Sequence, residues 1–118
     1  MRLCVPTEGE GGLDARMSEH FGRSPAFTIV DTATDSFETF ENPERSHDHG
    51  RCAVTTRLAD YTPDAVACRG IGQHALDSLH ALGIEVYRAR GPLVRDAVDQ
   101  VRHAPRRLAR AQDTCRET

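Results

Sequence analysis

The chain has 118 residues, a formal net charge of −3 at pH 7 and 38% hydrophobic residues. This length fits one compact domain with a real core, and the negative balance argues against general affinity for nucleic acid, which needs a basic surface. No apolar run of 18 or more residues occurs, and Met1–Pro6 is too short for a signal peptide, so we expect a cytoplasmic protein with no membrane contact.

Four cysteines are spread along the chain: Cys4, Cys52, Cys68 and Cys115. No two of them form a C-x-x-C pair, which excludes a zinc ribbon and a thioredoxin-type redox motif. Cys4 and Cys68 lie in apolar runs, where a buried thiol behaves as a small hydrophobic group, and we expect them in the core.

The first half of the chain predicts three strands. Leu3–Pro6 is a short apolar strand, and the glycine-rich loop 8–12 follows it. Ala26–Asp31 is rich in strand formers, and Thr32–Asp35 turns the chain back so that Phe37–Glu41 pairs with it as a hairpin.

The second half alternates helices and strands after a polar segment, 44–51, which predicts a mobile loop. Three apolar stripes at helical spacing predict three helices: Val54, Leu58 and Tyr61; Ala75, Leu76, Leu79 and Leu82; and Val94, Ala97, Val98 and Val101. Two strands are expected between these helices, Ala65–Cys68 and Ile84–Tyr87. Gly83 is expected to cap the C-terminus of the second helix, and Pro92 to lie in the first turn of the third.

This order of elements indicates an α/β fold. A β-α-β-α unit requires parallel strands with right-handed crossovers, and the hairpin adds an antiparallel member. The pattern therefore predicts a mixed five-stranded sheet with about three helices packed on it. We assign residues 1–104 to a single domain and residues 105–118 to a polar, Arg-rich tail.

A series of short motifs runs along residues 3–102. It comprises Val5–Thr7, Met17–Phe27, Val30–Asp31, Asn42–Pro43, Pro63–Val66, Gly70–Gly72, Gly83–Tyr87 and Gly91. The most specific part is His20-Phe21-Gly22-Arg23. Together these motifs resemble the dinitrogenase iron–molybdenum cofactor biosynthesis family, which includes small cofactor carriers and the orange protein that holds a molybdenum–copper sulfide cluster.

The resemblance implies a ribonuclease-H-like three-layer fold with strand order 3-2-1-4-5, in which strand 2 is antiparallel. The chain departs from similar proteins at Arg69, where a small residue is expected, and in the compact loop 46–52. In an open α/β sheet, ligands bind at the carboxyl ends of strands where the strand order reverses. With the implied order, that point lies between the first and fourth strands, at Thr7 and Arg69.

Two groups of residues could bind an anion there. The Gly70-Ile71-Gly72 turn presents backbone N–H groups at a helix N-terminus, and Arg69 adds a fork of donors. His20 and Arg23, before the second strand, offer a soft-metal ligand and an anion partner. The alternatives are that the glycines only form a tight turn and that His20 caps a turn; Phe21 between them is expected to fill the core.

His47, His49 and Cys52 form the densest group of metal-ligand types in the chain. Imidazole and thiolate suit iron, copper or zinc, and three donors favour an open or cluster-bridging site over a closed zinc site. Cys52 also begins a predicted helix, whose dipole lowers the pKa of a thiol. The alternative is a hydrophilic loop in which the histidines occur by chance.

Two functions of different classes follow. The first is a non-enzymatic carrier that binds a metal–sulfur cluster, of Fe–Mo–S or Mo–Cu–S type, and delivers it to an acceptor or scaffold protein. The second is a regulatory or interaction module that binds a small anion without a cluster.

Two enzyme classes are disfavoured by the sequence. The first strand lacks the carboxylate of a two-metal nuclease, and no G-x-S-x-G elbow of a hydrolase is present. We expect a monomer or weak homodimer.

Overall fold

The computed structural model describes residues 1–9, 11–42, 58 and 60–103. The elements in chain order are β1 (Arg2–Thr7), β2 (Ala26–Asp31), β3 (Phe37–Glu41), β4 (Ala65–Cys68), α2 (Gln73–Ala81), β5 (Glu85–Arg88) and α3 (Val94–His103). Leu58, Asp60 and Tyr61 are also helical, in agreement with the end of the first predicted helix. The predicted loop 44–51 and the tail 105–118 lie outside the described residues.

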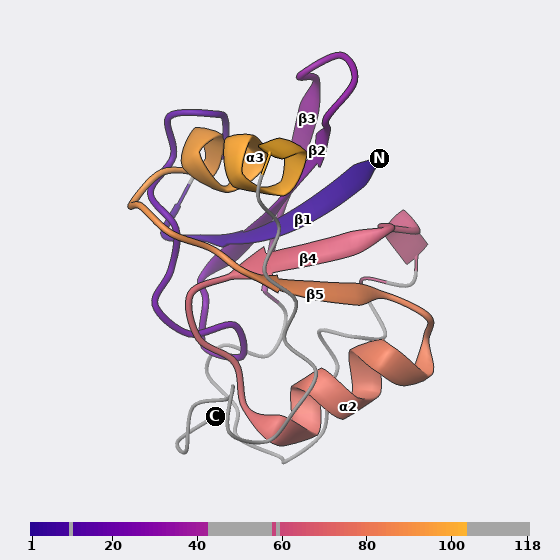
Figure 1. Cartoon of the computed structure of the whole chain (residues 1–118). Helices are drawn as coiled ribbons and strands as arrows, with labels where there is room; N and C mark the ends of the chain where they lie inside the picture. The colour runs from indigo at the N-terminus through magenta and orange to yellow at the C-terminus, as the bar shows by residue number, and fades with distance from the viewer. Residues whose placement is uncertain (10, 43–57, 59, 104–118) are drawn as a thin grey trace.

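The five strands form one mixed sheet in the order β3-β2-β1-β4-β5 (Figure 1). Strand β2 runs antiparallel to both of its neighbours, whereas β1, β4 and β5 are parallel to one another. The central strand β1 places Cys4 opposite Ile29 of β2 and opposite Val66 of β4. The strand order and the antiparallel second strand agree with the prediction.

The sheet is the middle of three layers, with α2 and α3 on opposite faces (Figure 1). Successive residues of a strand point to opposite faces, and β1 and β4 are apolar at nearly every position because both of their faces are covered. Cys4 and Val66 belong to the core on the α2 side. Leu3 and Ala65 belong to the core on the α3 side. The three-layer prediction is confirmed.

Two details at the helix ends differ from the prediction. Leu82 was expected on the buried face of α2 but is 50% exposed, because the helix ends at Ala81 and Gly83, at φ +78°, turns the chain away. Pro92 was expected in the first turn of α3. It lies before the helix instead, since the Leu93 carbonyl accepts the first helical hydrogen bond, from the Ala97 N–H at 3.3 Å.

The outer edge of β5 is covered by a side chain of α3. The Gln100 side-chain amide donates to the Arg88 carbonyl at 2.7 Å, and its oxygen accepts from the Arg90 N–H at 2.6 Å. Both backbone groups point away from β4, because the intervening Ala89 N–H bonds to the Cys68 carbonyl of β4. Among the described residues, no helix has the length and apolar character needed to cross a membrane.

Candidate functional site

The loop before β2 is bonded to the carboxyl ends of both β1 and β4. The Phe21 N–H donates to the Gly70 carbonyl at 2.9 Å, and the Ser18 N–H donates to the Pro6 carbonyl at 2.9 Å. The first bond joins the loop that carries His20 and Arg23 to the turn 69–72, and the second joins it to β1, at the point where the strand order reverses. We call this arrangement of residues 18–24 and 69–73 the carboxyl-end corner.

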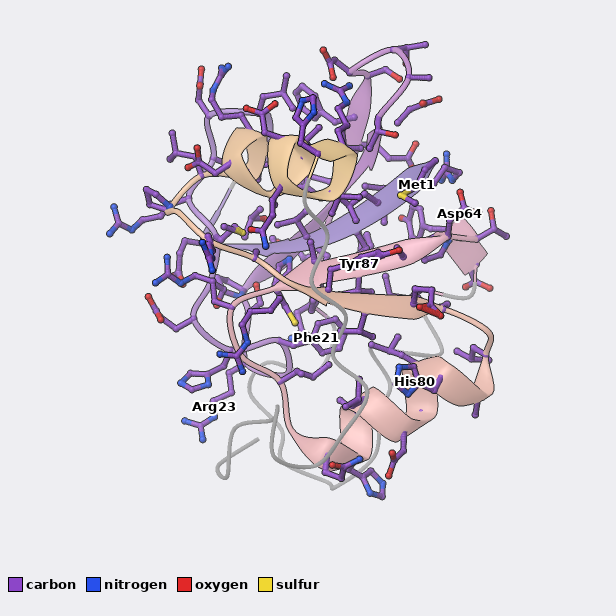
Figure 2. All side chains as sticks on the ribbon, viewed as in Figure 1. Met1, Phe21, Arg23, Asp64, His80 and Tyr87 are labelled. Atoms are coloured by element: carbon purple, nitrogen blue, oxygen red, sulfur yellow. The ribbon has the colours of Figure 1, made fainter. Side chains whose placement is uncertain are left out.

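An aromatic anchor holds the loop from inside. Phe21 is 1% exposed, and its ring packs on Phe27 of β2 with 5.2 Å between the ring centroids. Figure 2 shows Phe21 directed into the molecule and Arg23 directed outward from the same loop. The prediction that Phe21 fills the core is confirmed, and this packing leaves the residues beside it at the surface.

Two buried polar residues fix the loop backbone, and the sequence analysis did not identify them as positioning residues. The Asn42 amide donates to the Ser24 carbonyl at 2.8 Å and lies 3.3 Å from the Gly22 carbonyl. The Ser24 hydroxyl lies 2.9 Å from the Thr7 carbonyl. Both residues precede a proline. Short polar side chains commonly bond loop backbone, and this was the available signal.

Arg69 links the two segments of the corner to each other and to Gly91. Its Nη1 donates to the Gly91 carbonyl, beyond β5, at 2.8 Å, and its Nε lies 3.7 Å from a Glu19 carboxylate oxygen. Gly91 has φ +81°, and an added Cβ would lie 2.8 Å from the Asp96 side chain. A side chain at this position would therefore be strained as well as crowded. Sequence reasoning assigned no role to Glu19 or Gly91.

The N-terminus of α2 adds backbone donors to the corner. Gly72 is its N-cap residue in an extended conformation, with no side-chain cap, and its carbonyl accepts from the Leu76 N–H at 3.0 Å. The first-turn N–H groups consequently have no partner within the helix. No acidic residue lies in that turn, so the positive end of the helix dipole is not neutralised by its own side chains.

Two buried polar atoms at the corner have no hydrogen-bond partner in the described part of the chain: His20 Nδ1 and Gln73 Oε1. Buried polar groups in proteins are nearly always paired with protein, water or a bound group. A nitrogen of this kind can ligate a metal ion or donate to an anion, so the corner has capacity for a ligand.

The buried cysteines are not part of this site. Cys4 and Cys68 have no exposed surface. Burial raises the pKa of the Cys4 thiol far above its ordinary value, and a charge on Cys68 would raise it further, so Cys4 stays a neutral thiol at physiological pH. Their predicted core role is confirmed.

The second predicted site cannot be placed, since His47, His49 and Cys52 lie outside the described residues. Over residues 1–9, 11–42, 58 and 60–103, no three His, Cys, Asp or Glu side chains are grouped so that they could hold a metal ion. Within these ranges the corner offers the guanidinium groups of Arg23 and Arg69, the backbone N–H groups at the start of α2 and the imidazole of His20.

Comparison with known proteins agrees with the resemblance seen in the motifs. Residues 1–104 match the family model described as dinitrogenase iron–molybdenum cofactor. The chain belongs to this family. It is 30% identical to the orange protein from Desulfovibrio gigas, whose apo structure has a TM-score of 0.84 over 92% of each chain.

Two further relatives extend the comparison. A Thermotoga protein proposed as a NifB protein is 26% identical, with a TM-score of 0.82 over 99% of this chain and 98% of that one. An uncharacterized protein from Methanocaldococcus jannaschii is 28% identical over 102 residues, which cover 83% of this chain and 82% of that protein. The fold and the family are thus established.

Proposed function

We propose that this protein is a carrier that binds an anionic metal–sulfur cluster, of Fe–Mo–S or Mo–Cu–S type, and passes it to an acceptor protein without catalysing a reaction. The observation that carries the proposal is the Phe21–Gly70 hydrogen bond, which joins the His20–Arg23 loop to the Arg69–Gly72 turn. Membership of the iron–molybdenum cofactor family supports the class of cargo.

The chemistry of the corner suits such a cargo. Cluster sulfides carry negative charge and accept hydrogen bonds, which arginine guanidinium groups and the N–H groups of a helix N-terminus donate. The anion would be held by the side chains of Arg23 and Arg69 and by the backbone of the turn Gly70-Ile71-Gly72. His20 would add an imidazole ligand, a type that binds copper and iron.

We include His47, His49 and Cys52 in the proposal as further metal ligands. Asn42, the last described residue before segment 43–57, is bonded to the corner through the Ser24 and Gly22 carbonyls. Five residues of chain span at most about 18 Å, so covalent connectivity keeps His47 within that distance of Asn42. A thiolate at Cys52 would supply the soft donor that such clusters use.

The test is anaerobic reconstitution with iron and sulfide, and separately with tetrathiomolybdate and copper(I). After desalting, each sample is assayed for metal, labile sulfide and visible absorption. We expect stoichiometric colour that His20→Ala or Cys52→Ala abolishes. The matched controls are His80→Ala, at the exposed end of α2, and Cys115→Ala in the tail, and both should retain the colour. A wild-type protein that retains no metal in either trial would contradict the proposal.

A second candidate is an interaction module that binds a small anion without a cluster. It is favoured by the absence of three grouped metal-ligand side chains over the described ranges. This module would bind molybdate or phosphate through Arg23 and Arg69, would remain colourless after reconstitution, and would be insensitive to Cys52→Ala.

A further inference from the structure

Arg69 has two partners of different kinds. The Gly91 carbonyl accepts from Nη1 at 2.8 Å, a hydrogen bond to a fixed backbone group. The Glu19 carboxylate lies 3.7 Å from Nε, which is longer than a good hydrogen bond, and the Glu19 side chain is 71% exposed. The first partner therefore positions the guanidinium, and the second is held only by charge and can move away.

Glu19 cannot move far from Arg69, however. It directly precedes His20, and the Phe21 N–H is bonded to the Gly70 carbonyl next to Arg69. A carboxylate tethered in this way has a high local concentration at the guanidinium. An anion that binds Arg69 must displace Glu19 or share the guanidinium with it at a cost in repulsion.

We propose that Glu19 is an internal competitor for the anionic cargo at Arg69. The inference rests on the proposed function and adds a rule for which anions bind and how they leave. A monoanion that replaces the Glu19 carboxylate gains no net attraction, whereas a cargo with two or more negative charges does. When the cargo leaves for an acceptor, Glu19 neutralises Arg69 again, which favours release.

The experiment is anaerobic calorimetric titration of the full chain with tetrathiomolybdate, a dianion, at low and at physiological salt. The proteins are the wild type, Glu19→Gln, Arg69→Gln and the double variant. We expect Glu19→Gln to bind about two- to fivefold more tightly, the range of an exposed ion pair, and this gain to shrink at higher salt. In the Arg69→Gln background, the same change should have no effect, because the competitor acts through Arg69.

Glu38→Gln, which makes the same chemical change at an exposed position on the edge strand β3, is the control for net charge. A gain of equal size in Glu38→Gln, or a gain that persists without Arg69, would overturn the role of Glu19. Equal affinity in the wild type and Glu19→Gln, with weaker binding in Arg69→Gln, would overturn it too but leave the carrier proposal intact. No binding by any variant would overturn the role of Glu19, and the carrier proposal would then be decided by the reconstitution trials.

Discussion

Arg2 and Arg69 lie at opposite ends of the parallel strands β1 and β4, and their surroundings differ in kind. The Arg2 guanidinium donates twice to the Tyr61 carbonyl, at 2.7 and 3.0 Å, and the Arg2 backbone is bonded to Asp64. Arg69 shares its guanidinium between one carbonyl and a movable carboxylate. Figure 2 shows this separation, with Met1 and Asp64 at one end and Arg23 at the other.

The difference separates a structural arginine from one that can bind a ligand. At the amino end of the strands, one backbone carbonyl accepts from two nitrogens of the Arg2 guanidinium and holds it in place. At the carboxyl end, a buried imidazole nitrogen, His20 Nδ1, has no partner among the described residues, and the first turn of α2 has no side-chain cap. Unsatisfied polar groups lower stability, and in the described part of the chain the two that are buried both lie at the carboxyl end, which supports the binding role proposed there.

The largest change in unfolding free energy is expected on removal of the Phe21 ring, which anchors the loop at the carboxyl end. Phe21→Ala removes a fully buried ring and should lower the free energy of unfolding by about 3–5 kcal/mol in urea denaturation. Phe37→Ala, at a position that is 52% exposed, is the control and should change it by less than about 1 kcal/mol. Native-state hydrogen exchange in this variant should speed up first at the backbone amide of position 21, which bonds to the Gly70 carbonyl in the wild type. Equal acceleration at the Asp64 amide would show that the two ends do not respond separately.

An intermediate effect is expected at Asn42, which positions the loop without touching the proposed cargo. Asn42→Ala leaves the buried Ser24 carbonyl without its donor, and we expect a loss of about 1–3 kcal/mol in unfolding free energy. Thr34→Ala, which removes an exposed hydroxyl in the β2–β3 turn, should cost less than about 0.5 kcal/mol. A stability loss no larger than that of the control would contradict a positioning role for Asn42.

The smallest change in stability is expected when Arg2 or Arg69 is replaced by glutamine, one at a time. These two variants should differ most clearly in their affinity for tetrathiomolybdate. Arg2→Gln should lower the unfolding free energy by about 1–2 kcal/mol and leave tetrathiomolybdate affinity unchanged. Arg69→Gln should cost less than about 1 kcal/mol in stability but weaken that affinity roughly tenfold. Paired denaturation and titration measurements check both variants. Similar profiles for the two would contradict the distinction between the ends.

Most strands and helices could be predicted from the sequence because their apolar residues repeat with strand or helix periods. The runs at Ala26–Asp31 and Ala65–Cys68 match the observed strands at every residue. The strand order came from the family resemblance, since short strands do not encode which neighbour they pair with. Leu82 was misassigned because it continues the helical stripe by one step beyond the point where the backbone turns.

The site was only partly accessible to the same reasoning. Motifs such as His20–Arg23 and Gly70–Gly72 are contiguous in sequence and could be recognised. Contacts between a side chain and a distant backbone group, such as Asn42 with Ser24 or Arg69 with Gly91, leave no periodic trace. The three predicted metal ligands, His47, His49 and Cys52, lie outside the described residues, and their role stays a prediction.

The Gln100 amide has a consequence for how the molecule meets its neighbours. By occupying the Arg88 carbonyl and the Arg90 N–H, it imitates the next strand of the sheet and removes two groups that another chain could pair with. A strand added beside β5 could therefore run only along its first residues. This side chain thus shortens the part of the β5 edge at which a second copy of the chain could add a strand to the sheet.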